Sequence, residues 1–347
     1  MRDTEFQTRP GDASAPLTPV LAFQLSVDGL PACLWLKLES HNAHGSVKDR
    51  TALALWRDVA PRVHPDTGLI ESTSGNLGVA LAAIAADHGV PFTAVTDPRS
   101  PASVVAAIRA LRGTVVTVDR PDGAGGYLLS RLAHIRERLA AQPRLVWPNQ
   151  YANPANPRAH AEGTAPELWS QTGRRPARVL VAVSTGGTLA GFRDFVAGAR
   201  PDWELVGVDV TGSAALGGTP GRRLLSGIGA SRPSSFLPGG HHPAVRVTPR
   251  DAVGACLWFA DATGVAVGAS SGALIAAALR LFRAAPGRAD IACLCPDGAA
   301  PYGETVYSAH WRRRNGVDPP GDFARGVHVI GSGRPPERAP AGTGRTP

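Results

Sequence analysis

The sequence predicts an α/β protein of two lobes, each a mostly parallel sheet covered by helices, with a ligand-binding cleft between them. Apolar strand-like runs alternate with helical segments over most of the 347 residues, which is the pattern that produces parallel sheets. These runs are too numerous for one regular sheet, so two sheets are expected. A hydrophobic content of 43% is sufficient to bury a core in each lobe.

Strands and helices are expected in alternation along the chain. The expected strands, short apolar runs between turn residues, are 34–38, 68–72, 92–96, 114–118, 145–147, 179–183, 204–208, 265–268 and 291–295. The expected helices, with helical apolar periodicity, are 47–59, 77–87, 101–111, 125–140, 157–169, 189–197, 249–262 and 272–285. Residues 1–14 and 320–347 are rich in Gly, Pro and Arg and are expected to be disordered.

Composition and charge disfavour several classes of partner. The formal charge is +8, but the basic residues are scattered and form no lysine-rich block, so no nucleic-acid partner is expected. No apolar run approaches the roughly 20 residues of a membrane span. The N-terminus lacks the apolar segment of a secretory signal, so a cytoplasmic location is expected. The cysteines have neither metal-ligand nor obvious disulfide spacing, so we expect no metal and no disulfide. They are Cys33, Cys256, Cys293 and Cys295.

Four loops that each follow a predicted strand consist largely of Gly, Ser, Thr and Asn. They contain the sequences ESHNAHGSVKDR, TSGNLG, STGGT and ASSGA. Such residues permit tight turns and offer donors at helix N-termini, and ligands bind at the carboxyl ends of parallel strands. Any one of these loops is more often a packing feature than a binding site, and only their combination indicates a ligand.

Two of the loops suggest a cofactor with one phosphate and an aldehyde. The STGGT loop at 184–188 leads into a predicted helix, whose N-terminus favours a phosphate. It lacks the Gly-Lys-Ser/Thr ending of a nucleotide-binding loop, and no GxGxxG fingerprint is apparent. Lys48 is one of only two lysines among 36 basic residues. Because an amine can form a Schiff base and a guanidinium cannot, the retained lysine suggests pyridoxal 5'-phosphate.

Six ordered motifs resemble those of the cysteine synthase family of fold-type II pyridoxal-phosphate enzymes. They are NAHGSVKDR, STSGNLG, NQYANPANPRAHAEGTAPELW, STGGTLAG, SGIGAS and GASSGA, and with PLTPVL near the start they cover about residues 16–310. The resemblance implies a large cofactor-binding domain of residues 15–41 and 153–319 and a small mobile domain of residues 42–152. It also implies a homodimer that acts on small amino-acid substrates.

The resemblance assigns a role to each matching residue. Lys48 would bind the cofactor aldehyde and later act as the base at the substrate Cα. Asn76 would donate to the phenolic oxygen, and Ser270 would face the pyridine nitrogen, where a neutral group favours β-elimination over transamination. The phosphate would be held by Ser184, Thr185, Gly186, Gly187 and Thr188. The substrate carboxylate would be bound by Thr73, Ser74, Gly75 and Gln150. The implied reaction eliminates the leaving group of an O-activated serine to give an aminoacrylate, which a nucleophile then attacks.

Three departures from the sulfhydrylases of this family bear on the substrate. Ser184 stands in place of Gly in the phosphate loop, and Tyr151 stands in place of Phe after the carboxylate-binding Gln. This pair resembles the branch that condenses O-phospho-L-serine with L-glutamate, giving N-(2-amino-2-carboxyethyl)-L-glutamate on the way to 2,3-diaminopropionate. The stretch PDGAAPYGET also lacks an arginine that the family commonly has there. Tyr151 is therefore a candidate substrate-binding residue.

Arginines would suit a phosphorylated donor, because a guanidinium can bind phosphate through two hydrogen bonds. The candidates that flank SGIGAS are Arg222, Arg223 and Arg232, and Arg232 is taken as a substrate-binding residue, although each is more often a surface arginine.

Other reactions are compatible with the same motifs. The nearest alternative is a cysteine or S-sulfocysteine synthase that uses O-acetylserine or O-phosphoserine with a sulfur nucleophile. A serine or threonine dehydratase would release the aminoacrylate to water instead. A catalytically silent subunit would be free to lose Lys48, Asn76 and Ser270, all of which are present. The absence of a dinucleotide fingerprint disfavours a nicotinamide oxidoreductase.

Overall fold

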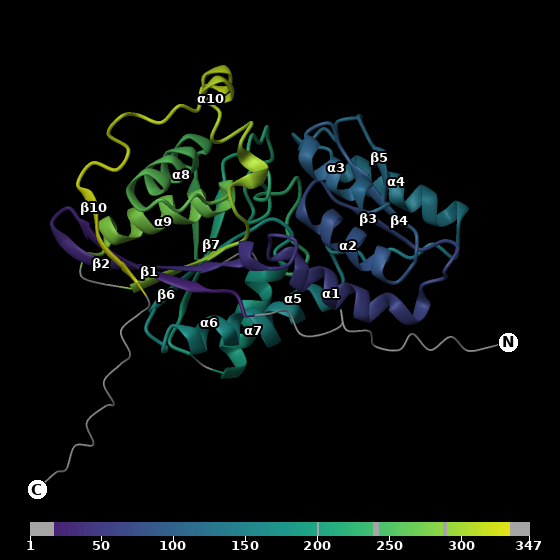
Figure 1. The fold of residues 1–347 in the computed structure, drawn as a ribbon, viewed down its shortest axis with the longest axis horizontal. Helices are drawn as coiled ribbons and strands as arrows, with labels where there is room; N and C mark the ends of the chain where they lie inside the picture. Colours follow the sequence, from purple (N-terminus) through teal and green to yellow (C-terminus); the bar gives the residue numbers. More distant parts are fainter. Residues whose placement is uncertain (1–16, 200, 239–242, 287–289, 334–347) are drawn as a thin grey trace, which may run out of the picture.

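Two α/β lobes lie side by side (Figure 1), which confirms the predicted fold class. The computed structural model describes residues 17–199, 201–238, 243–286 and 290–333.

The strands are β1 (Val20–Val27), β2 (Leu30–Leu38), β3 (Leu69–Ser72), β4 (Phe92–Thr96), β5 (Thr114–Thr117), β6 (Arg178–Ala182), β7 (Glu204–Val210), β8 (Ala244–Val247), β9 (Asp290–Cys295) and β10 (Val327–Gly333). The α-helices are α1 (Lys48–Val59), α2 (Asn76–Asp87), α3 (Ala102–Ala110), α4 (Leu128–Ala141), α5 (Ala155–Ala159), α6 (Ala165–Gln171), α7 (Gly187–Ala199), α8 (Pro249–Thr263), α9 (Ala269–Ala284) and α10 (Ala309–Asn315). Short 3-10 or π turns are η2 (Glu39–His41), η3 (Ala60–Arg62), η4 (His160–Thr164) and η5 (Ala300–Tyr302).

The larger lobe is a seven-stranded sheet with the order β10-β1-β2-β9-β6-β7-β8. The last five strands of that order are parallel, whereas β1 is antiparallel to both β2 and β10. Successive side chains of a strand point to opposite faces of the sheet. Leu34 and Leu36 of β2 accordingly pack with α8 and α9, whereas Trp35 packs with α6 and α7. Helices therefore cover both faces (Figure 1).

The smaller lobe is a parallel sheet with the order β3-β4-β5. The helices α1, α2 and α3 share one core with β3 and β4. A second core brings Ile135 of α4 together with Ile70 of β3 and Val95 of β4. This lobe is therefore also covered by helices on both faces.

A buried ion cluster joins α1 to the large lobe. Lys37 Nζ of β2 lies 2.6 Å from a carboxylate oxygen of Glu167 in α6, and Arg50 of α1 lies 2.7 Å from both Glu39 and Glu167. Lys37 and Glu39 are 0% exposed. Lys37 is part of this cluster, which anchors the helix that begins at Lys48.

The predicted elements differ from the structure mainly at the edges of the large sheet. The elements predicted from the sequence do not include the strands β1, β8 and β10 or the helix α10. Residues 327–333 were predicted to be disordered but pair with β1, because backbone pairing at a sheet edge does not require an apolar sequence. The predicted termini 1–14 and 334–347 lie outside the described residues.

Two predicted strands are reduced to single bridges, and one predicted helix is divided. Val267 forms only a bridge to Gly298, and Val146 forms only a bridge to Leu69. The helix predicted at 157–169 is divided into α5, the π turn η4 and α6.

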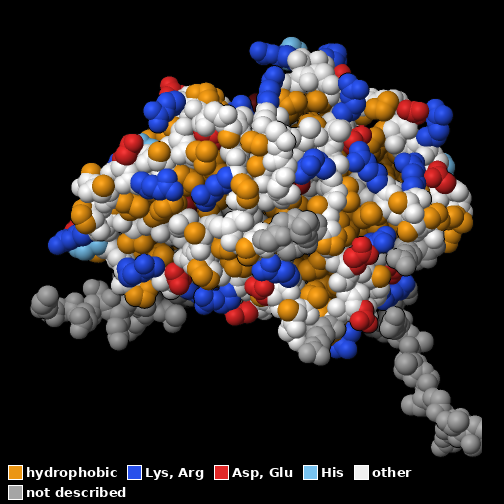
Figure 2. Space-filling view, turned by 180° about the vertical axis from the view of Figure 1, so that it is seen from behind, with side chains coloured by type: hydrophobic (Ala, Val, Ile, Leu, Met, Phe, Trp, Pro, Cys, Tyr) orange, Lys and Arg blue, Asp and Glu red, His pale blue; other side chains and the backbone are white. Residues whose placement is uncertain are grey.

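The surface view in Figure 2 shows Lys and Arg side chains spread among acidic and hydrophobic ones on that face, rather than gathered in one patch. Within the described ranges, no helix has both the length and the apolar character needed to cross a membrane. The four cysteines are buried and are not bonded to one another.

Candidate active site

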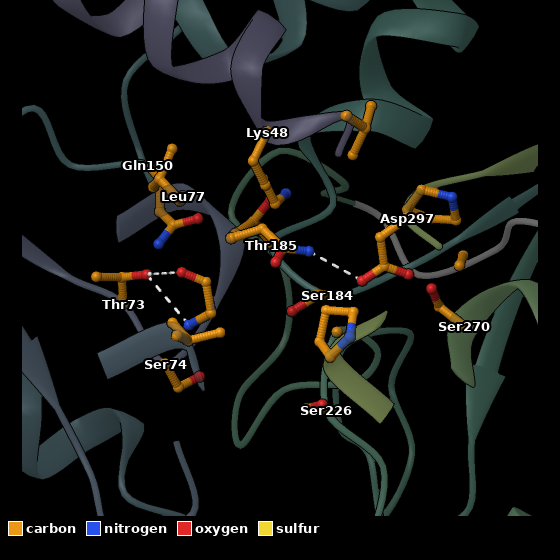
Figure 3. Close-up of a pocket in the computed structure, with 18 of the residues that line it drawn as sticks. Lys48, Thr73, Ser74, Leu77, Gln150, Ser184, Thr185, Ser226, Ser270 and Asp297 are labelled. Carbon is orange, nitrogen blue, oxygen red and sulfur yellow. Dashed lines mark hydrogen bonds between the residues drawn. The ribbon is translucent and has the colours of Figure 1, made fainter. Parts of the chain in front are cut away.

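A cleft lined by both lobes lies at the carboxyl ends of β3, β6 and β9 (Figure 3). At this edge of a parallel sheet, loops lead into helix N-termini and ligands bind. Of the residues predicted to form the site, all except Gly187 and Arg232 line this cleft. Motifs that lie far apart in the sequence therefore meet in one cavity.

Lys48 is the first residue of α1, and the preceding loop fixes its position. The Val47 N–H donates to the carbonyl of Pro296 at 2.8 Å, and the Lys48 N–H donates to Ser46 Oγ at 3.1 Å. Burial lowers the pKa of Lys48 to about 8, against the opposing effect of the Asp297 charge. A larger fraction of this amine is therefore uncharged at neutral pH than in an exposed lysine, as attack on an aldehyde requires.

Two glycines allow the 184–188 loop to close tightly. Gly186 has a φ of +86°, and a Cβ there would lie 2.0 Å from the hydroxyl of Ser234. A Cβ on Gly187, where α7 begins, would lie 2.3 Å from the side chain of Asn156. Gly187 is thus packed behind the loop, which explains why it does not line the cleft. The loop stands at the N-terminus of a 13-residue helix, which is an anion-binding arrangement.

The loop after β3 is held by the hydroxyl of Thr73. This hydroxyl donates to the Gly75 carbonyl at 3.2 Å and accepts from the Gly78 N–H at 3.0 Å. Gln150 Nε2 donates to the carbonyl of Ser72 at 2.8 Å, so its side chain lies beside this loop. The residues predicted to bind a substrate carboxylate therefore form one wall of the cleft.

The residues predicted to face the cofactor ring include Asn76 and Ser270, and Asp297 lies with them. Asp297 Oδ2 accepts hydrogen bonds from Asn76 Nδ2 at 2.9 Å and from the Tyr302 hydroxyl at 2.8 Å. Burial raises the pKa of Asp297 to about 6, although both hydrogen bonds and the charge of Lys48 lower it. The Ser270 hydroxyl is buried and has no hydrogen-bond partner within the described structure.

A second hollow adjoins the first. The two have volumes of about 120 and 150 Å³. Both are lined by Ser74, Tyr151, Ser184, Ser226 and Gly227. A substrate bound at the cofactor can therefore extend into the second hollow.

Arg131 of α4 is a buried cation in this second hollow. It is 5% exposed, and its Nε and Nη1 nitrogens have no hydrogen-bond partner in the described structure, although Nε lies 3.5 Å from the Asp97 carboxylate. Burial raises the pKa of Tyr151, and the positive charge of Arg131 opposes that rise. A guanidinium with unused donors, beside the hydroxyls of Tyr151 and Ser184, is suited to an anion.

The three arginines predicted near the substrate have other surroundings. Arg232 lies over the ring of Tyr151, with its Cζ 5.8 Å from the ring centroid, and lines neither hollow. Arg223 donates to the carbonyls of Gly212 and Ala230, so much of its hydrogen-bonding capacity serves its own loop. Arg222 is exposed at the mouth of the cleft. Their roles in substrate binding remain predictions.

Sequence reasoning missed Arg131 and Asp297. Arg131 follows Leu128 by three residues and precedes Ile135 by four, so helical periodicity places it on the buried face of α4. Asp297 directly follows a predicted strand, at the edge where the other site residues were expected. The helical periodicity around Arg131 and the position of Asp297 at the end of a predicted strand are the signals that could have identified these residues.

These residues fit pyridoxal phosphate. The cavity holds a lysine of lowered pKa, an anion-binding loop at a helix N-terminus, and an unpartnered serine hydroxyl. These groups meet the needs of its aldehyde, its phosphate and its ring nitrogen, respectively.

Comparisons with known proteins agree with this chemistry. The model of the family described as pyridoxal-phosphate dependent enzyme matches residues 11–297. The N-(2-amino-2-carboxyethyl)-L-glutamate synthase of Ralstonia nicotianae is 37% identical over 301 residues, which cover 86% of this chain and 89% of that protein. The structure of an O-ureido-L-serine synthase superposes with a TM-score of 0.77 at 29% identity, covering 91% of this chain and 98% of the other. An O-acetylserine dependent cystathionine beta-synthase from Helicobacter pylori superposes with a TM-score of 0.77 at 27% identity, covering 87% of this chain and 99% of the other.

Proposed function

Because the chain belongs to the family of pyridoxal-phosphate dependent enzymes, we propose that it condenses O-phospho-L-serine with L-glutamate, giving N-(2-amino-2-carboxyethyl)-L-glutamate and phosphate. The chain is a pyridoxal-phosphate-dependent enzyme of β-replacement, in which a nucleophile replaces the leaving group on the β-carbon of an amino acid. The proposal concerns the identity of the two substrates. The relative that is 37% identical supports it, because its name gives the same product.

In the proposed reaction, the residues of the cleft bind the donor and move one proton. Pyridoxal phosphate, when bound, supplies an electron sink for the negative charge that develops at the substrate Cα. The Lys48 amine takes the proton from Cα and returns a proton to Cα once the nucleophile has added. The wall formed by Thr73, Ser74, Gly75 and Gln150 binds the donor carboxylate, and movement of the small lobe over that carboxylate would exclude water. Ser270 would face the ring nitrogen as a neutral group.

The observation that favours a phosphorylated donor is that two buried guanidinium nitrogens of Arg131, Nε and Nη1, lack a hydrogen-bond partner in the described structure. A buried donor that lacks a partner costs free energy unless a ligand satisfies it. A phosphate on the serine oxygen would reach the second hollow from the cofactor site, where the hydroxyls of Tyr151 and Ser184 add further donors. An acetyl group carries no negative charge, so it would offer these nitrogens a weaker acceptor than a phosphate does.

The mouth of the cleft favours an acidic nucleophile. A third hollow of about 520 Å³ shares Pro101, Ser226 and Tyr302 with the cofactor cavity. Arg99 and Arg222 line it together with Arg223, whereas Glu304 is the acidic residue of its lining within the described chain. This excess of positive charge attracts an amine that carries two carboxylates, as glutamate does.

We also expect a homodimer in the cytoplasm that works without a metal, a nucleic acid or a membrane. These expectations come from the family resemblance and the composition. Sedimentation of the purified protein tests the dimer.

A substrate matrix tests the proposed function. The purified holoenzyme is offered O-phosphoserine or O-acetylserine with glutamate, sulfide or thiosulfate in turn, and products are identified by mass, with Lys48→Ala as the inactive control. We expect the glutamate adduct and free phosphate from O-phosphoserine. Cysteine or S-sulfocysteine without a glutamate adduct would favour the sulfur-nucleophile synthase instead. Pyruvate and ammonia released without any adduct would indicate a dehydratase.

A further inference from the structure

We propose that Asp297 is a positioning residue for the cofactor, because its carboxylate fixes which end of the Asn76 amide faces the cleft. This role is independent of which donor and nucleophile the enzyme uses. It is distinct from the roles that the sequence motifs assign to Lys48, Asn76 and Ser270.

Two segments of the chain hold the backbone around Asp297 in place. Ser46 and Asp297 form an isolated antiparallel bridge, and the Val47 N–H donates to the carbonyl of Pro296 at 2.8 Å. The Gly268 N–H donates to the carbonyl of Asp297 at 3.3 Å. The segments that precede Lys48 and Ser270 thus both contact Asp297, and its carboxylate lines the same cavity as those side chains (Figure 3).

The side-chain contacts determine the orientation of Asn76. An ionised carboxylate can only accept hydrogen bonds, so the Asn76 amide must turn its nitrogen toward Asp297 Oδ2, 2.9 Å away. One of the two amide hydrogens is used there, and the other remains available as a donor. The predicted partner of Asn76 is the phenolic oxygen of the cofactor, which is an acceptor. Asp297 therefore favours the amide orientation that this contact requires.

Tyr302 in turn holds Asp297. The Tyr302 hydroxyl donates to the same Oδ2 at 2.8 Å, and Tyr302 is 3% exposed. Asp297 is 4% exposed, and its Oδ1 has no hydrogen-bond partner in the described structure. The carboxylate is thus held through Oδ2, while Oδ1 is buried beside the backbone of Gly268.

Protonation of Asp297 would release this constraint. The titratable groups whose charges influence Asp297 or are influenced by it are Lys48, Tyr302, Cys256 and Cys295. Burial raises the pKa of Asp297 to about 6, opposed by the bonds from Tyr302 and Asn76 and by the Lys48 charge. A protonated carboxyl can donate as well as accept, so below about pH 6 the Asn76 amide is no longer restricted to one orientation.

The affinity of the apoenzyme for pyridoxal phosphate and the absorbance of the bound cofactor test this proposal without any substrate. At pH 8, Asp297→Asn is expected to weaken cofactor binding about tenfold, because an amide at position 297 no longer selects one orientation of Asn76. In the wild type, the visible absorbance of the bound cofactor should change as pH falls through about 6. This change should be lost in Asp297→Asn. In Tyr302→Phe it should move to higher pH, because a bond that lowers the pKa of Asp297 is removed.

A double-mutant cycle distinguishes positioning from a general structural role. If Asp297 acts through Asn76, the double variant Asn76→Ala/Asp297→Asn binds the cofactor no more weakly than Asn76→Ala alone. If the losses of cofactor affinity in Asn76→Ala and Asp297→Asn add up in the double variant, the proposal is overturned. It is also overturned if Asp297→Asn binds the cofactor with wild-type affinity and keeps the pH dependence of the wild type. Thermal unfolding of each variant checks folding. If Asp297→Asn does not fold, the test is the pH at which the cofactor absorbance changes in Tyr302→Phe. If that pH is the same as in the wild type, the proposal is overturned. None of these measurements depends on the substrates, so they can fail while the proposed function stands.

Discussion

The Nε2 atom of His160 lies 3.3 Å from the hydroxyl of Thr188, the last residue of the predicted phosphate loop. The same nitrogen lies 3.3 Å from the hydroxyl of Thr51 in α1, and Nδ1 lies 3.0 Å from Thr164 Oγ1. Burial and the charges of Lys48 and Arg50 lower the pKa of His160 to about 3, so the ring is neutral at physiological pH. His160 therefore joins the loop to the helix that begins at Lys48.

Replacement of His160 is expected to weaken cofactor binding according to which ring nitrogen is lost. His160→Asn retains a group near Nδ1 but does not reach Thr188, and we expect cofactor affinity to fall about fivefold, which corresponds to one hydrogen bond. His160→Gln reaches the Nε2 position and should restore most of the affinity. Equal losses in both variants, measured by titration of the apoenzyme, would show that the contact with Thr188 is not what matters.

Replacement of Arg131 is expected to separate the two serine donors. Arg131→Met should lower kcat/KM for O-phosphoserine by about 10- to 100-fold, because a hydrogen bond to a charged group contributes about 1.5–3 kcal/mol. The value for O-acetylserine should change little. Arg136→Met is the matched control, since Arg136 is an exposed residue of the same helix that lines neither hollow. Equal losses with both donors would contradict a phosphate site at Arg131.

Removal of Lys37 is expected to destabilise the fold strongly. Lys37→Met leaves the carboxylate of Glu167 without its 2.6 Å partner inside a cluster where Lys37 is 0% exposed. Loss of one partner of a buried pair costs about 3–5 kcal/mol. Arg62→Met is the control: its partner Asp58 lies 3.5 Å away in an exposed pair, and such a pair contributes less than about 1 kcal/mol. Denaturant unfolding compares the two. If Lys37→Met and Arg62→Met have similar free energies of unfolding, the buried cluster does not stabilise the fold.

Cofactor uptake by the apoenzyme is expected to depend on the ionisation of Lys48. Only the uncharged amine attacks an aldehyde, and burial lowers the pKa of Lys48 to about 8. The uptake rate should therefore rise from about pH 7 to about pH 9 and then level off. In Asp297→Asn the midpoint should move to lower pH, because the carboxylate raises the pKa of Lys48. A rate that still rises above about pH 10 would indicate an ordinary exposed lysine.

The parts of the fold and site that sequence predicted are those with a local signature. The helices α1, α2 and α8 have apolar periodicity, and the loops around Lys48 and at 184–188 have turn residues at helix starts. β8 and β10 lie at the edges of the large sheet, where side chains are partly exposed and the apolar pattern is weak.

Other parts of the site depend on tertiary structure alone. Arg131 reaches the cleft only because α4 packs against β3 and β4. The contact of Asp297 with Asn76 joins residues separated by 221 positions in the chain, and no local pattern reports such a pairing.

The central claim is that Lys48 is the residue that holds the cofactor, and the chain offers a direct test because Lys37 is its only other lysine. The holoenzyme is treated with borohydride, which makes the bond between cofactor and amine permanent, and is then digested and analysed by mass. We predict the reduced cofactor on the peptide that contains Lys48 and an unmodified peptide around Lys37. Cofactor attached at Lys37, or on neither lysine, would contradict the account.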